Sequence, residues 1–363
     1  MTSGAILLIF SCLSASLVTS SRFMFLPYGV LAGSAHGILR TTSLVAATDI
    51  GSSRRVTSVS VATLGHSMGG IVGTFVYFYF MSDYLTAGAW ANNFRILELS
   101  AVVAHLLGAV VRRPVGVTAQ ARASIVISDF GFHSVAVFHA IAFVAIGVLH
   151  YLMPLMPLVR MFSFSKYETF FNPLFALYCG EWLGAVLLAI TGACCGKGAG
   201  RMCLFLGGVV VFLLGVAVMP HKPAYDSFWA YMGLSLGVGF ATAFAQVFVS
   251  VGVARRTGGI AVGVSVSLLM FWQDMGTLFG IVAVDQLNSA FSLDTALYMS
   301  GGFLLFAGLA LIVCHFTVKP LIQFRKPFDS DSETSSNGAR DAGIANPGLG
   351  RWDSYEYDYR YMH

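Results

Sequence analysis

Residues 130–156 read FGFHSVAVFHAIAFVAIGVLHYLMPLM, and this stretch contains no Asp, Glu, Lys or Arg. A bilayer core about 30 Å thick requires about 20 apolar residues per helical span. The stretch is long enough to cross such a core as a helix. It therefore predicts a membrane-spanning segment near the middle of the chain.

Apolar stretches of similar length, separated by short polar breaks, fill most of the chain on both sides. The sequence is 56% hydrophobic and 10% charged, against about 25% charged residues in an ordinary soluble domain. We expect an all-α polytopic membrane protein with about ten spans, and the composition excludes most water-soluble enzymes. The nine further spans are predicted at 4–20, 23–48, 57–82, 95–111, 170–194, 202–220, 227–253, 259–284 and 295–317.

Neither a metal site nor a cofactor is indicated. The cysteines lie in or beside apolar stretches without ligand spacing, which favours packing roles over a disulfide framework or a zinc site. The net charge of +4 comes from small basic groups between apolar stretches, so no nucleic-acid partner is expected. The six cysteines are Cys12, Cys179, Cys194, Cys195, Cys203 and Cys314.

The basic residues of the short loops predict the orientation. Lys and Arg gather in cytoplasmic loops of membrane proteins, and alternate loops of this chain hold most of them. We expect these loops and the C-terminus to be cytoplasmic, with the plasma membrane favoured over an organelle. The richer set is Arg54, Arg55, Arg112, Arg113, Arg122, Lys197, Arg201, Arg255, Arg256, Lys319, Arg325 and Lys326; the poorer set is Arg22, Arg160, Lys166 and Lys222.

The predicted domains follow from the spacing of the spans. Residues 1–114 form an N-terminal bundle of about four helices, 115–128 a cytoplasmic linker, and 129–320 a C-terminal bundle of six. Residues 321–363 form a disordered cytoplasmic tail, because their composition cannot bury enough apolar surface to fold. An alternative for the first span is a signal peptide, since the apolar stretch has a suitable length but no basic residue before it.

Several glycine-rich motifs carry a resemblance to a known family. In the N-terminal part these are GVLAGSAHG from Gly29, DIGSSRR from Asp49, GHSMGG from Gly65, and AGAW from Ala87. The C-terminal part has GVGF, ARRTGG, QDMGTLFG and DTALYMSGG, which start at Gly237, Ala254, Gln273 and Asp294. The chain resembles the major facilitator superfamily of transporters, in particular its monocarboxylate-porter branch, with nodulin-like facilitators as the alternative.

This resemblance implies twelve helices in two halves of six, so by this comparison the chain lacks the first two. It also implies transport of a small organic solute by alternating access around a midplane site. One departure concerns the helix that corresponds to the eighth of the family. There the family often has an acid followed four positions later by Arg, whereas this chain has Glu181 and Ala185.

Charged side chains within spans are costly, so they usually line a cavity or pair with one another. Arg40 and His36 lie four residues apart, hence on one helical face. We expect them to face the solute site, and the alternative is that Arg40 extends along the helix to the cytoplasmic headgroups. The expected solute-binding residues are His36, Arg40, His66, Tyr178, Trp182, Gln246 and Gln273.

Glu181 and Asp274 are the two acids nearest the middle of spans, and with His139 they are the candidates for proton coupling. The alternative for each acid is a structural pair with a cation or hydroxyl on the next helix. A lone intramembrane His is often a packing residue, which applies to His66, His105 and His139. Asp129 and Glu98 lie near helix ends, where capping explains them.

The motif from Gly65 to Gly69 also matches the G-x-S-x-G nucleophile elbow of serine hydrolases. That chemistry requires a strand before the Ser and a helix after it. Here the motif lies inside one long apolar segment, so we expect its glycines to make close helix contacts and expect no enzyme. The predicted function is transport, with proton coupling and oligomeric state open; the alternative is a degenerate or truncated facilitator that acts as a receptor or scaffold.

Overall fold

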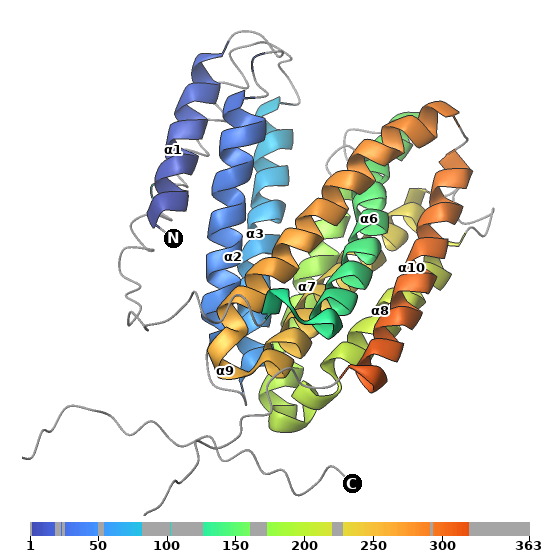
Figure 1. The fold of residues 1–363 in the computed structure, drawn as a ribbon. Helices are drawn as coiled ribbons and strands as arrows, with labels where there is room; N and C mark the ends of the chain where they lie inside the picture. Colours follow the sequence, from blue (N-terminus) through green and yellow to red (C-terminus); the bar gives the residue numbers. More distant parts are fainter. Residues whose placement is uncertain are drawn as a thin grey trace, which may run out of the picture. The chain divides into compact units, whose positions relative to one another are not determined.

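The computed structural model describes residues 2–18, 23, 26–49, 54–81, 102, 126–159, 173–219, 228–290 and 293–318. In these ranges every long element is a helix (Figure 1). The N-terminal helices are α1 (Thr2–Leu17), the π-helix η2 (Leu26–Ala32), α2 (Gly33–Asp49) and α3 (Arg55–Met81). The C-terminal helices are α6 (Phe130–Val159), α7 (Pro173–Arg201), α8 (Cys203–Val218), α9 (Phe228–Ala290) and α10 (Leu293–Thr317).

The helices confirm the all-α architecture that the apolar stretches predicted. Each predicted span in the described ranges coincides with helical backbone to within a few residues. The span at 95–111 falls outside those ranges, apart from one residue. Within the described residues, five segments are suited to crossing a membrane by length and composition: Phe130–Met153, Pro173–Cys194, Phe228–Thr257, Val262–Val284 and Thr295–Thr317.

Helix α9 is continuous in its backbone assignment, but its contacts require it to fold back on itself. A straight helix rises 1.5 Å per residue, so residues eight apart lie about 12 Å apart along the axis. Thr257 Oγ1 nevertheless lies 2.9 Å from Ser265 Oγ, eight positions later. The chain therefore reverses between these residues, which leaves two limbs that correspond to the two separately predicted spans.

The two limbs of α9 lie at the centre of the described helices. They pack against α6, α7 and α8 and also contact α2 and α3, while α10 packs on α8 and α6 (Figure 1). Fully buried Leu149, Val211 and Leu304 belong to one cluster that joins α6, α8 and α10. Leu44, Val59 and Leu269 belong to a second cluster, which extends to α2 and α3.

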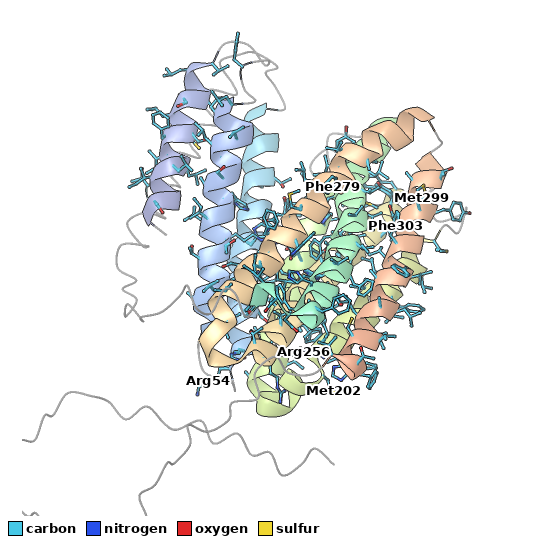
Figure 2. The ribbon with its side chains drawn as sticks, in the orientation of Figure 1. Arg54, Met202, Arg256, Phe279, Met299 and Phe303 are labelled. Carbon is cyan, nitrogen blue, oxygen red and sulfur yellow. The ribbon has the colours of Figure 1, made fainter. Side chains whose placement is uncertain are left out.

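Large apolar side chains also cover the outside of the helices. Phe279, Met299 and Phe303 are 61%, 39% and 43% exposed and point away from the bundle (Figure 2). Such a surface is unfavourable in water and favourable in hydrocarbon. This is the surface expected of an integral, multi-pass membrane protein.

Two of the basic loops lie at one end of the helices, together with the C-terminal end of α10. Arg55 donates from Nη1 to the carbonyl of Ala254 at 3.4 Å. Arg256 donates from Nη2 to the carbonyls of Cys314 and His315, each at 3.1 Å, and thereby satisfies the end of α10. Figure 2 shows Arg54 and Arg256 at this same end. The position of these arginines at one end agrees with the distribution of Lys and Arg among the loops. That this end faces the cytoplasm stays a prediction.

The predicted domain limits stay predictions as well. Most of the linker at 115–128 and the whole tail at 321–363 lie outside the described residues. The described helices fall into an N-terminal group, α1 to α3, and a C-terminal bundle, α6 to α10. These two names are used below for the two sets of helices.

Candidate functional site

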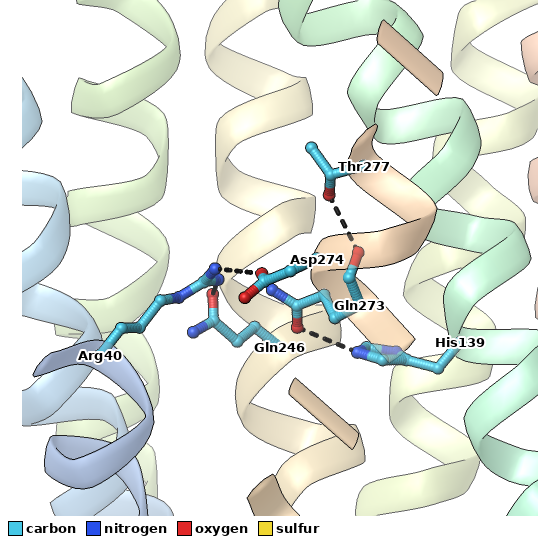
Figure 3. A network of polar contacts seen from close by, with 6 residues as sticks. All are labelled: Arg40, His139, Gln246, Gln273, Asp274 and Thr277. Atoms are coloured by element: carbon cyan, nitrogen blue, oxygen red, sulfur yellow. Dashed lines mark hydrogen bonds and ion pairs between the residues drawn. The ribbon is translucent and has the colours of Figure 1, made fainter. Parts of the chain in front are cut away.

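Arg40 joins the N-terminal group to the C-terminal bundle. Its Nη1 lies 2.8 Å from Asp274 Oδ1, and its Nη2 donates to Gln246 Oε1 at 3.1 Å (Figure 3). The two partners come from different limbs of α9. The side chain of Arg40 is 17% exposed and points into the bundle. The alternative in which Arg40 extends to the headgroups is therefore wrong for this structure.

Gln273 and Asp274 are neighbours on the second limb of α9 but face different partners. Successive helical residues point about 100° apart, so Asp274 meets Arg40 while Gln273 faces α6. His139 Nε2 lies 3.1 Å from Gln273 Oε1 (Figure 3). Because an amide oxygen only accepts, this contact requires a hydrogen on Nε2. His139 Nδ1 is buried and has no hydrogen-bond partner among the described residues.

Glu181 is the deeply buried acid of the site, with 3% of its surface exposed on α7. The charge of Arg40 acts on it electrostatically. The first limb of α9 packs closely here, since a Cβ at Gly239 would lie 2.9 Å from the Glu181 backbone nitrogen. Glu181 on α7 and Asp274 on the second limb of α9 are thus the two acids of the site, and Asp274 is the one that pairs with Arg40.

The imidazoles of His36 and His66 form the N-terminal face of this cluster. Their ring centroids lie 5.5 Å apart, on α2 and α3. Arg40 acts electrostatically on both rings, and His66 is also coupled to His150 of α6. The structure therefore brings together most of the predicted site: His36, Arg40, His66, His139, Glu181, Gln246, Gln273 and Asp274.

His150 is a member that the sequence analysis missed. It is electrostatically coupled to Arg40, and its Nε2 is buried without a hydrogen-bond partner in the described part of the chain. It follows His139 by eleven positions, which is just over three helical turns and places both on one face. That spacing was visible in the sequence and would have identified it.

Tyr178 and Trp182 both lie on α7, but their side chains have different surroundings. Tyr178 packs its ring on α3, because a Cβ at Gly70 would overlap that ring. Trp182 is half-buried beside Glu181. No hydrogen bond among the described residues links Trp182 to Arg40, whose two terminal nitrogens bind Asp274 and Gln246. The place of Trp182 in the site stays a prediction.

The remaining candidates have structural explanations or lie outside the described ranges. Asp129 caps α6, where Oδ2 accepts from the Phe132 amide at 2.7 Å and Oδ1 from the Gly131 amide at 3.3 Å. His105 and Glu98 are outside the described residues. No group of three or more His, Cys, Asp or Glu among the described residues is arranged to hold a metal ion.

The G-x-S-x-G segment lies entirely within α3. Ser67 is fully buried, and its Oγ donates to the Thr63 carbonyl at 3.0 Å. A nucleophile elbow needs a strand-to-helix turn at the Ser, so this segment lacks the geometry of a hydrolase. The predicted close contacts are correct at Gly70 and wrong at Gly65 and Gly69, where a Cβ would have no atom of the described residues within 4 Å.

Comparison with known proteins finds solved structures with a similar fold. No family model and no curated protein sequence matches the chain. Among solved structures, a variant of the Escherichia coli fucose:proton symporter FucP aligns with a TM-score of 0.59 and 11% identity, over 87% of this chain and 82% of that one. FucP in the outward conformation gives 0.61 and 13% over 87% and 81%. A bacterial homologue of the iron transporter ferroportin, outward-facing, gives 0.52 and 15% over 86% and 81%.

Proposed function

We propose that this protein moves a small organic solute across a membrane by alternating access and couples the movement to protons. Its fold is that of major facilitator superfamily transporters, in which two bundles rock about a midplane site. The observation that carries the proposal is the contact of Arg40 with Asp274 and Gln246, because it joins the two sets of helices through charged and polar groups. Intramembrane charge is costly and is retained where a pathway or a proton relay needs it.

We assign the residues of the site to two proposed roles, solute contact and proton carrying. Arg40, Gln246, Gln273, His36 and His66 contact the solute. Asp274, which is 46% exposed in its side chain, and the buried Glu181 are the acids that can carry a proton. His139 and His150 extend the polar cluster along α6. The monocarboxylate-like and nodulin-like subtypes both stay open within this proposal.

The test uses purified protein in liposomes with an imposed pH gradient, and L-fucose is one first probe because a structural neighbour is a fucose:proton symporter. A neutral isostere at a coupling acid, Glu181→Gln or Asp274→Asn, should abolish pH-driven uphill uptake. Exchange at equal concentrations should survive, because reorientation of the loaded carrier no longer waits for protonation. A variant that keeps full pH-driven uptake would remove its acid from coupling.

The same preparation separates transport from structure. Arg40→Ala should abolish uptake, and Arg40→Lys should lose most of it, since a point charge does not replace a guanidinium that binds two partners. Arg54→Ala is the matched control, because Arg54 is an exposed arginine at the end of the helices. Normal uptake by well-folded Arg40→Ala protein would contradict the assignment of Arg40.

A further inference from the structure

The cluster around Arg40 contains more carboxyl groups than guanidinium groups, and this excess bears on the charge of the solutes that the site accepts. Among the described residues, the cluster holds one guanidinium and two carboxyl groups: Asp274, which pairs with Arg40 at 2.8 Å, and the buried Glu181 of α7. The other members are amides and imidazoles. The inference below rests on the proposed transport function and concerns which solutes this site accepts.

The guanidinium is already engaged. Nη1 is paired with Asp274 Oδ1 and Nη2 with Gln246 Oε1, so both terminal nitrogens have an acceptor (Figure 3). The Nε of Arg40 is buried, with no hydrogen-bond partner among the described residues. An entering anion can still meet one of the N–H groups left on Nη1 or Nη2. Because Nε is enclosed, however, the two-pronged contact that carboxylates make with Arg would compete with Asp274 or Gln246 for the outer edge of the guanidinium.

The acid is the more accessible partner of the pair. The Asp274 side chain is 46% exposed, against 17% for Arg40. The ion pair uses Oδ1, and Oδ2 stands beside it. A donor from the solute, either an ammonium or a hydroxyl, can bind the Asp274 carboxylate without breaking the pair.

An organic anion faces an added cost. If it takes Arg40, the Asp274 carboxylate loses its partner and stands beside the anion itself. Removing one partner of a buried pair leaves an uncompensated charge, which costs more than the intact pair contributes. A solute without net negative charge avoids this cost.

We propose that the site selects solutes that present hydrogen-bond donors to Asp274 and carry no net negative charge, and that it rejects monocarboxylates. The shared chemistry is a donor group on a small polar molecule, supplied by a polyol or by an amine. Asp274 is the specificity-determining residue, and Arg40 holds its carboxylate in place while cancelling part of its charge.

The test measures binding to the purified protein, with the whole chain present, by ligand-dependent thermal stabilisation. Three probes of similar size are used at one pH: erythritol, ethanolamine and L-lactate. Erythritol or ethanolamine should stabilise the protein at concentrations about tenfold lower than L-lactate, in line with one additional charge-assisted contact. Which of the two binds identifies the source of the donor.

Asp274→Asn provides the decisive variant, because it removes the charge and keeps the shape. Ethanolamine binding should weaken about tenfold, and lactate binding should improve, since the competing carboxylate is gone. Lys222→Ala, in a predicted loop of the same chain, is the control for unspecific charge effects and should leave all three affinities unchanged. The melting temperature without ligand confirms that each variant is folded.

The outcomes separate this inference from the proposed function. Preferential lactate binding that is lost in Arg40→Ala and unimproved in Asp274→Asn would overturn the inference and leave transport standing. Binding of none of the three probes, together with no uptake of any of them into liposomes, would count against both. Erythritol or ethanolamine binding that is insensitive to Asp274→Asn would overturn the role of Asp274.

Discussion

Helices of the C-terminal bundle meet backbone to backbone at several glycines, whereas the N-terminal group meets that bundle through extended side chains as well as through one such close approach, where a Cβ at Gly192 of α7 would lie 2.9 Å from the Thr57 backbone nitrogen of α3. A Cβ at Gly180 or Gly239 would overlap carbonyls of the facing helix in the α7–α9 pair, and Gly276 and Gly280 play the same part between α9 and α6. Gly208 and Gly308 do so between α8 and α10. Contacts of this kind fix two helices at one distance, because any added atom must push them apart.

The boundary between the two sets of helices has a different character. Arg40 reaches across to Asp274, Arg55 to the carbonyl of Ala254, and Tyr178 to Gly70. Extended side chains can leave a partner by rotating, without a change in helix spacing. The difference fits the proposed transport, in which one bundle moves as a body while contacts at the boundary are made and broken.

The largest expected effect comes from breaking a backbone contact inside the bundle. Gly239→Ala places a methyl group against the Leu177 carbonyl of α7. We expect a loss of about 3 kcal/mol or failure to fold, since overpacking a close helix contact forces the backbones apart. Thermal unfolding in detergent and the yield of monodisperse protein provide the measurement.

Gly237→Ala is the matched control, because it lies on the same limb of α9 and its Cβ would meet nothing within 4 Å. Alanine is favoured over glycine in a helix by about 1 kcal/mol, so this variant should be neutral or slightly stabilising. Equal destabilisation by the two substitutions would contradict the proposed role of the close contact.

A medium effect is expected at Arg55, which is 6% exposed and ties three helices together. Its Nε donates to the Thr48 carbonyl at 2.9 Å at the end of α2, and its Nη1 reaches Ala254 of α9. Arg55→Ala should cost about 2 kcal/mol, because hydrogen bonds from a charged donor are lost and buried carbonyls become unsatisfied. Thermal unfolding measures the loss.

Arg54→Ala serves as the control here, since Arg54 is exposed and precedes Arg55 directly. The comparison is sharpened by labelling a cysteine introduced at Ser58 from the predicted cytoplasmic side. Faster labelling in Arg55→Ala than in Arg54→Ala would show that the contact holds this end closed. Identical stability and labelling in the two variants would contradict that role.

The sequence predicted the helices well because apolar length is a local property. Each span could be read within its own stretch, and this includes the two limbs of α9, which the sequence predicted as separate spans and which the Thr257–Ser265 contact confirms. The site was predicted in part for the same reason: an ionisable residue in a span stands out wherever it lies. The pairing of Arg40 with Asp274 could not be predicted in this way, since the two residues are 234 positions apart in the sequence.

The glycines show why the rest escaped prediction. Gly69 and Gly70 are adjacent residues of one motif. A Cβ at Gly69 would meet none of the described residues within 4 Å, whereas a Cβ at Gly70 would overlap the ring of Tyr178. Which of them is in contact depends on how α3 is rotated against α7, and no pattern within α3 determines that. The same reasoning explains why close contacts were expected at Gly65, where the structure has none.

The smallest expected effect concerns this contact between α3 and α7. Gly70→Ala adds a methyl group at the ring of Tyr178, which is a side chain and can move aside. Stability should therefore change by less than about 1 kcal/mol. The balance between conformations should change more, because the added group penalises only the arrangement in which α3 and α7 are in contact.

Site-directed labelling measures that balance. Gly70→Ala should raise the reactivity of a cysteine introduced at Ser58, on the same helix, while Gly69→Ala should leave it unchanged because position 69 is open. Adding Tyr178→Ala to Gly70→Ala should restore the original reactivity, since it removes the ring that the methyl group meets. The rescue distinguishes contact from general damage: a variant that merely weakened α3 would become more reactive still when a second large side chain was lost. Failure of the rescue, with folding intact, would show that the ring of Tyr178 does not hold the two sets of helices together.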